Sequence, residues 1–220
     1  MKSAVALLFR SIFEALGNLT WYCRNWQLFK VGLLTLAHYF LLNPYRVCRE
    51  YMVYFSENQV QKIYGETAFA TLATLSTLAG LSSKDTVYDL GCGRGLGVFW
   101  WASVIGCKSV GIDLVPTFIR QANAIKKQAG IQHVEFMHHS IFETDLSDAT
   151  FIYLYGTAFS EHAVHRLVEQ FRALPAGVLI ASISYPLSAY AQAHEYTLLH
   201  EVEVGFLWGK TTAYLQRKNG

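Results

Sequence analysis

This sequence of 220 residues has few cysteines, and their spacing matches no common metal or redox motif. There are four cysteines, none of them in a CxxC pair, and no His/Cys cluster has the spacing of a zinc site. Serine, histidine and aspartate likewise show no spacing typical of a nucleophilic triad. We therefore expect no metal, and a reducing cytoplasmic location where free thiols pack as small apolar groups; the four are Cys23, Cys48, Cys92 and Cys107.

Charged residues are also scarce, at 15% of the chain, and no run of lysine and arginine resembles a DNA-binding tail. The net charge of +2 is unevenly spread. Residues 1–55 hold six basic and two acidic side chains, a net +4, whereas the rest hold twelve basic and fourteen acidic ones, a net −2. We therefore expect no nucleic-acid partner, and an anionic partner surface for the first segment only.

The apolar run near the N-terminus, residues 31–42 (VGLLTLAHYFLL), is short: it has 12 residues, whereas a membrane span needs about 20. Three interpretations stay open: a helix packed on the domain, an interfacial membrane helix, or a cleaved signal or transit peptide. Trp21, Tyr22 and Trp26 would anchor the interfacial helix at headgroup level. Residues 5–16 are typical of a short amphipathic helix. We expect a basic, apolar helical extension that can contact a membrane surface peripherally.

From about residue 60 the sequence alternates between helical and extended patterns. The expected helices are 66–80, 95–106, 116–129 and 160–173. The expected strands are 86–90, 109–113, 133–137, 150–155 and 177–184, then 195–204 and 207–217, which join at Gly205. Strands separated by helices form a parallel sheet that is covered on both faces. We predict an extension over 1–58 and, over 59–220, a three-layer, doubly wound α/β domain whose mostly parallel seven-stranded sheet ends in an antiparallel hairpin.

Glycine is concentrated in residues 89–95 (DLGCGRG), at the end of the first expected strand. Gly91 and Gly93 allow the backbone to turn sharply and to approach a ligand without Cβ interference. The next helix begins there with free N–H groups. Leu96 stands where a dinucleotide fingerprint has its third glycine, and no lysine follows the loop as in a phosphate cradle. Asp113 closes the second strand, where a carboxylate can accept both hydroxyls of a ribose.

The strand-end Asp89, the glycine loop and Asp113 together resemble the S-adenosyl-L-methionine site of class I methyltransferases, over roughly residues 60–217. The resemblance implies that Asp89 lies near the methionine amino group and that Asp113 binds the ribose. It also implies that Ser140 hydrogen-bonds the adenine amine and that Ile141 packs on the ring. The full set of cofactor-binding residues that we expect is Glu66, Thr67, Asp89, Gly91, Cys92, Gly93, Gly95, Asp113, Leu114, Ser140, Ile141 and Tyr155.

Two flanking segments narrow the resemblance. YGETAF (64–69) and YGTAF (155–159) resemble segments of the disruptor-of-telomeric-silencing group, the non-SET histone lysine methyltransferases. In that group a Glu-Thr-x-Phe segment contacts the cofactor, and Glu66, Thr67 and Phe69 match it. The group reads Asn-Asn-Phe-Ala-Phe after its fourth strand, whereas YGTAF has tyrosine and glycine in place of both asparagines.

The resemblance implies methyl transfer to a protein lysine amine. An amine must arrive unprotonated, which a desolvating aromatic channel favours. The residues expected around the acceptor are Tyr64, Tyr155, Phe159 and Tyr185, with Glu66 between cofactor and channel. No Asp/Asn-Pro-Pro-Tyr/Phe box follows the fourth strand, so methylation of bases and of glutamine is not expected. The alternatives are a small-molecule acceptor, a non-catalytic module that binds a partner through residues 1–55, and a nicotinamide oxidoreductase, which Leu96 and the terminal hairpin disfavour.

Overall fold

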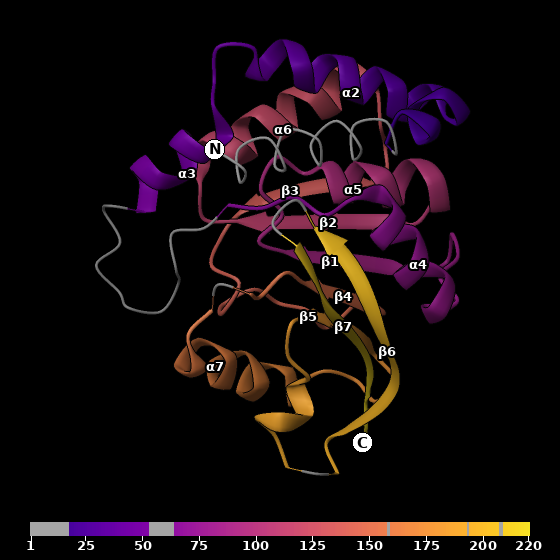
Figure 1. The fold of residues 1–220 in the computed structure, drawn as a ribbon, viewed down its shortest axis with the longest axis vertical. Coiled ribbons are helices and arrows are strands. Elements are labelled where there is room, and N and C mark those ends of the chain that lie inside the picture. The colour runs from indigo at the N-terminus through magenta and orange to yellow at the C-terminus, as the bar shows by residue number, and fades with distance from the viewer. Residues whose placement is uncertain (1–17, 53–63, 158, 193, 207–208) are drawn as a thin grey trace.

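The computed structural model describes residues 18–52, 64–157, 159–192, 194–206 and 209–220. A seven-stranded sheet forms its centre (Figure 1), in the order β3-β2-β1-β4-β5-β7-β6. The strands are β1 (Thr86–Leu90), β2 (Lys108–Asp113), β3 (Val134–His138), β4 (Phe151–Leu154), β5 (Leu179–Ile183), β6 (Tyr196–Phe206) and β7 (Gly209–Lys218). Neighbouring strands pair in parallel across β3, β2, β1, β4 and β5. Strand β7 is antiparallel to both β5 and β6. The predicted fold class is confirmed.

Helices cover both faces of this sheet (Figure 1). The clusters of buried side chains place α2, α4, α5 and α6 on one face and α7 on the other. The helices are α2 (Trp26–Tyr39), α3 (Pro44–Met52), α4 (Phe69–Ala79), α5 (Leu96–Trp100), α6 (Pro116–Ala129) and α7 (Glu161–Phe171), and residues 18–24 are also helical. A π-helix, η1 (Trp101–Ile105), continues α5, and a 3-10 helix, η2 (Leu187–Ala189), follows β5.

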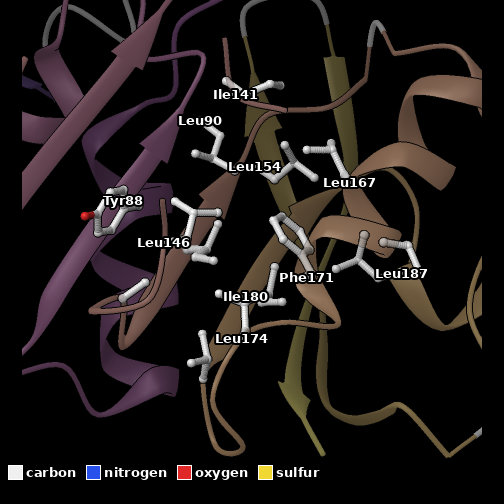
Figure 2. Close-up of a cluster of buried hydrophobic side chains, with 14 of the residues drawn as sticks. Tyr88, Leu90, Ile141, Leu146, Leu154, Leu167, Phe171, Leu174, Ile180 and Leu187 are labelled. Atoms are coloured by element: carbon white, nitrogen blue, oxygen red, sulfur yellow. The ribbon is translucent and has the colours of Figure 1, made fainter. Parts of the chain in front are cut away.

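The side chains of β1 alternate between the two faces, because successive residues of a strand point to opposite sides. Tyr88 and Leu90 pack in the cluster that α7 covers, which Figure 2 shows together with Phe171. Val87 packs in the opposite cluster, beneath α4 and η1. Asp89 is therefore directed to the face of α4 and α5, and its side chain is buried there.

Helix α2 packs on the domain. Leu28 joins the cluster that contains Trp100, and Val31 joins the cluster under α6; both side chains are fully buried. The cap residue Asn25 accepts a hydrogen bond from the Leu28 N–H at 2.9 Å and donates one to the Ser103 carbonyl at 2.6 Å. The inward face of α2 thus agrees with a helix packed on the domain. Within the described part of the chain, no helix is long and apolar enough to cross a membrane.

The helix predicted over 66–80 begins later, at Phe69. Thr67 is extended instead, because it forms an isolated antiparallel bridge with Phe206 of β6. The helix predicted over 95–106 also differs, since it changes to π geometry at Trp101.

The predicted hairpin turn at Gly205 is wrong. Gly205 lies within β6, where it pairs with Lys210, and the last pair of the hairpin is Phe206 with Gly209. The connection therefore falls on residues 207–208. Those two residues, the predicted helix over 5–16 and the predicted boundary at residue 58 lie outside the described residues.

Candidate functional site

The glycine loop connects β1 to α5 at the carboxyl edge of the sheet. Gly91, Gly93 and Gly95 have positive φ angles of 89°, 53° and 79°, a region that residues with a Cβ rarely adopt. An added Cβ at Gly95 would collide with the ring of Phe136 in β3, whereas at Gly91 it would meet nothing within 4 Å. The loop is therefore tightly packed towards β3 and open at Gly91.

A small cavity lies beside this loop, between the segment 64–67, the ends of β1 and β4, and the start of α5. Seven of the predicted site residues line it: Tyr64, Glu66, Thr67, Asp89, Gly91, Cys92 and Tyr155. Eight predicted residues do not: Gly93, Gly95, Asp113, Leu114, Ser140, Ile141, Phe159 and Tyr185. Six lining residues are not among the predicted ones: Gly65, Leu72, Arg94, Leu96, Gly97 and Tyr153.

Asp89 presents a buried carboxylate to the cavity. Its side chain is 6% exposed, and no donor among the described residues forms a hydrogen bond with it. Burial raises the pKa of Asp89 to about 8, and the nearby charge of Asp113 adds to the rise. Gly97 leaves room for this carboxylate, since an added Cβ would lie 3.0 Å from Oδ2. A cationic donor bound in the cavity would pair with Asp89 and favour its ionised form.

Asp113 ends β2, close to the other side of the loop. Its Oδ2 accepts a hydrogen bond from the Gly93 N–H and its Oδ1 one from the Val115 N–H, both at 2.8 Å. Burial raises the pKa of Asp113, and these two hydrogen bonds oppose the rise. The orientation of the carboxylate is therefore fixed, while each oxygen keeps capacity for a further donor.

The residues predicted to contact adenine lie near the carboxyl ends of β2 and β3. Ser140 turns towards its own loop, where its hydroxyl accepts a hydrogen bond from the Phe142 N–H at 3.3 Å. Ile141 is buried in the cluster that also contains Leu90 (Figure 2). Leu114 follows β2 and is half-buried. The predicted adenine contacts stay predictions.

The four aromatic residues predicted for the acceptor form two groups. Tyr64 and Tyr155 line the cavity. Phe159 and Tyr185 instead lie around Gly156, where an added Cβ would collide with the Tyr185 hydroxyl and lie 3.2 Å from Phe159. The Tyr185 hydroxyl is buried and has no hydrogen-bond partner in the described part of the chain. The structure thus brings together half of the predicted acceptor pocket.

Cys92 lines the cavity as an apolar group. Its side chain is buried, and burial raises the pKa of the thiol well above its ordinary value. The other cysteines are also free. In the described ranges, no group of three or more His, Cys, Asp or Glu side chains is placed to hold a metal ion.

Two residues that were not predicted shape the cavity wall. Tyr153 is in register with Asp89 on the neighbouring strand, and its hydroxyl lies 2.6 Å from the Thr67 hydroxyl. Arg94 forms an ion pair with Glu66. The alternation of β4 is a signal for Tyr153, which faces the same side as Asp89. Nothing in the sequence indicates which residue Arg94 contacts.

A known family matches the part of the chain that builds this site: residues 87–176 match the family described as "Methyltransferase domain". A protein-lysine N-methyltransferase from Saccharolobus islandicus is 31% identical over 94 residues, which are 42% of this chain and 58% of that protein. The chain therefore spans less than two thirds of the length of this curated relative.

Solved methyltransferase structures share the fold. An RNA methyltransferase from Salinibacter ruber, solved with S-adenosyl-L-homocysteine, has a TM-score of 0.59 and 26% identity over 70% of this chain and 94% of its own. A geranyl diphosphate C-methyltransferase from Streptomyces coelicolor has a TM-score of 0.55 and 16% identity over 69% of this chain and 79% of its own. At the latter identity the likeness concerns the fold alone.

Proposed function

We propose, on the premise that residues 87–176 belong to the methyltransferase domain family, that the chain transfers the methyl group of S-adenosyl-L-methionine to a lysine amine of a protein. The predicted enzyme class and cofactor are confirmed. The matched family and the curated relative are methyltransferases, and solved neighbours contain S-adenosylhomocysteine or S-adenosylmethionine. The acceptor is the part that we propose.

The unpartnered carboxylate of Asp89 is the observation that best fits this cofactor. S-adenosylmethionine supplies a methyl group on a positively charged sulfur to an incoming nucleophile. Asp89 would accept a hydrogen bond from the ammonium of the methionine part, and Asp113 has acceptor capacity left for ribose hydroxyls. The open backbone at Gly91 leaves space for the ligand at the loop.

The aromatic wall of the cavity supports an amine acceptor. Tyr64, Tyr153 and Tyr155 surround the same space as Asp89. Removal from water by aromatic side chains disfavours a charged ammonium, so a lysine that enters beside the tyrosines and away from the Asp89 carboxylate would do so as a neutral amine with a free lone pair. The protein then has to orient the amine and exclude water, which accounts for much of catalysis in displacement reactions. The 31% identity to a protein-lysine N-methyltransferase adds support.

An RNA acceptor is the second candidate. The likeness to the RNA methyltransferase, at 26% identity over 70% of this chain, favours it. The charge of the catalytic part argues against it, because residues 56–220 carry a net −2 and binding to a phosphate backbone depends on basic side chains.

The acceptor can be identified by supplying the purified chain with tritiated S-adenosylmethionine and an extract of its source cells. A lysine acceptor predicts label in protein that resists ribonuclease, and methylated lysine in the mass spectrum of the labelled band. Asp89→Ala should abolish the label. Label in RNA or in a small-molecule fraction would contradict the lysine proposal, and cofactor binding without label in any fraction would indicate a non-catalytic module.

We also propose that α2 contacts an anionic membrane surface, because this helix is apolar on two opposite faces. Its inward face is buried in the core. Four large apolar residues, spaced to share the outward face, are exposed by 53 to 80%: Trp26, Leu33, Leu36 and Phe40. Residues 18–49 contain four basic and no acidic side chains. Glu50, the next residue, pairs with Arg46, so the charge that accompanies these aromatic and aliphatic groups is net positive. Such a combination fits the headgroup region of an anionic bilayer.

Sedimentation with vesicles tests the membrane proposal. The chain should sediment with phosphatidylglycerol vesicles, less with phosphatidylcholine vesicles, and less at high salt. The double variant Leu36→Gln/Phe40→Gln should abolish sedimentation, while Leu198→Gln, at a residue 47% exposed on β6, should leave it unchanged. A wild-type chain that stays in the supernatant with every vesicle would refute membrane contact.

A further inference from the structure

Arg94 occupies the centre of the glycine loop, yet its side chain extends to another segment. Its Nε donates to Glu66 Oε1 at 2.5 Å and its Nη2 donates to Oε2 at 2.7 Å. The Tyr64 hydroxyl donates to the same Oε1, also at 2.5 Å. Both oxygens of Glu66 are therefore occupied by groups of the chain itself. A two-point pair of this kind fixes direction as well as distance.

The pair is shielded from solvent. The side chains of Arg94 and Glu66 are 18% and 28% exposed. Burial alone would lower the pKa of Arg94, but the hydrogen bonds and charges of Glu66 and Tyr64 outweigh it and raise the pKa. The guanidinium is therefore always charged, and removing Glu66 would leave a shielded cation without its partner.

Helix α2 reaches the same guanidinium. The Arg94 Cζ lies 5.1 Å from the ring centroid of Tyr39, within the range of a cation–π contact. Tyr39 is 8% exposed, and its ring packs beside Phe118 at 6.5 Å. Phe118 in turn packs against Tyr64 at 5.3 Å. Arg94 thus contacts both α2 and the segment 64–67.

The segment 64–67 forms one wall of the cavity, and its position relative to the loop is narrowly set. An added Cβ at Gly93 would lie 2.9 Å from the Tyr64 ring, so this ring already rests against the loop backbone. Tyr64 and Glu66 both face the space that Asp89 faces. A shift of this wall would change the shape of the space that receives the cofactor.

We propose that Arg94 is a positioning residue of the cofactor site: it holds Glu66 and Tyr64 against the glycine loop and, through Tyr39, makes the geometry of this wall depend on α2. The inference rests on the proposed use of this cavity for the cofactor. Arg94 would then affect cofactor binding by holding Glu66 in place rather than by contacting the cofactor. The N-terminal extension would affect the site through Tyr39, which does not line the cavity.

Calorimetric titration of the full chain with S-adenosylhomocysteine tests this role. Arg94→Ala should weaken binding by roughly tenfold, and Arg94→Lys should restore part of the loss, because lysine keeps the charge but lacks the two-point geometry. Arg94→Ala/Glu66→Gln should bind no more weakly than Arg94→Ala, since the two residues act as one unit. Tyr39→Leu should weaken binding several-fold, although Tyr39 does not line the cavity.

Arg172→Ala is the matched control. Arg172 lies just after the end of α7 and pairs with Glu169 and Glu195. Its loss removes ion pairs away from the cavity and should leave the affinity for S-adenosylhomocysteine unchanged. A wild-type chain that does not bind S-adenosylhomocysteine would overturn the proposed function and this inference with it. A wild-type chain that binds, with Arg94→Lys and Tyr39→Leu binding equally well, would overturn the inference alone.

Discussion

At the scale of single residues, the site depends on a carboxyl group that the fold buries without giving it a hydrogen-bond donor from the described part of the chain. Asp89 faces α4 and α5 because it alternates with Tyr88 and Leu90, which face α7. A buried carboxylate without a partner is costly in its ionised form. The position of Asp89 at the strand end was predictable from the sequence. Its raised pKa was not, because it depends on packing by distant segments.

The stability of the chain should fall with rising pH because of Asp89. The folded chain holds the proton of this carboxyl more tightly, with a pKa of about 8 against 3.8 ordinarily. The contribution to stability is therefore greatest below about pH 4 and declines up to about pH 8, by at most about 1.4 kcal/mol per pH unit. Asp89→Asn should flatten this decline in urea unfolding between about pH 5 and pH 8.5. Parallel curves for both proteins would contradict the prediction.

Two glycines with similar backbone angles should respond differently to alanine. Gly95 and Gly130 have φ angles of 79° and 75°, but an added Cβ collides with Phe136 only at Gly95 and meets nothing at Gly130. Gly130→Ala should cost about 1 kcal/mol of backbone strain, and Gly95→Ala about 1 to 3 kcal/mol more from overpacking. Urea unfolding measures both free energies, and equal losses would show that the loop yields to the side chain.

At the scale of elements, the strands were predictable because their apolar runs and, in the terminal hairpin, their alternation are local properties of the sequence. The start of α4 was not. The sequence ETAF favours a helix, but Thr67 is extended by its bridge to Phe206, which lies far along the chain. The cavity wall exists because of this departure, since a helix beginning at 66 would remove the segment 64–67 from the loop. Nothing in the sequence indicates the π geometry at Trp101.

Asn25 should stabilise the chain through two separate contacts. Its side chain caps α2 by accepting from the Leu28 N–H and also donates to the Ser103 carbonyl. Asn25→Ala should cost about 1 to 2 kcal/mol. Asn25→Ser keeps the capping oxygen but is too short to reach Ser103, so its loss should be intermediate. Chemical denaturation compares the three proteins, and equal stability of the serine and asparagine forms would show that the contact with Ser103 adds nothing.

At the scale of the whole molecule, α2 belongs to the core that it covers. Leu28 and Val31 are fully buried, and burial of such side chains contributes about 2 kcal/mol each. Deleting residues 1–42 should therefore lower the stability by about 4 kcal/mol or more and should lower the midpoint of thermal unfolding. An unchanged midpoint would show instead that the extension and the domain predicted over 59–220 are independent.

The whole architecture was predictable because the order of helices and strands, with the terminal hairpin, admits few topologies. The acceptor pocket was predictable only in part. Its aromatic residues come from segments that meet only in the fold, and the structure places Tyr64 and Tyr155 at the cavity but Phe159 and Tyr185 around Gly156.

Because Tyr185 closely approaches Gly156, the residue that position 156 can hold depends on the residue at position 185. The space that a side chain at position 156 would fill is already taken by the phenol from the end of β5. A side chain at position 156 would therefore fit only if position 185 became smaller in the same step or before it, so the residues tolerated at the two positions depend on each other.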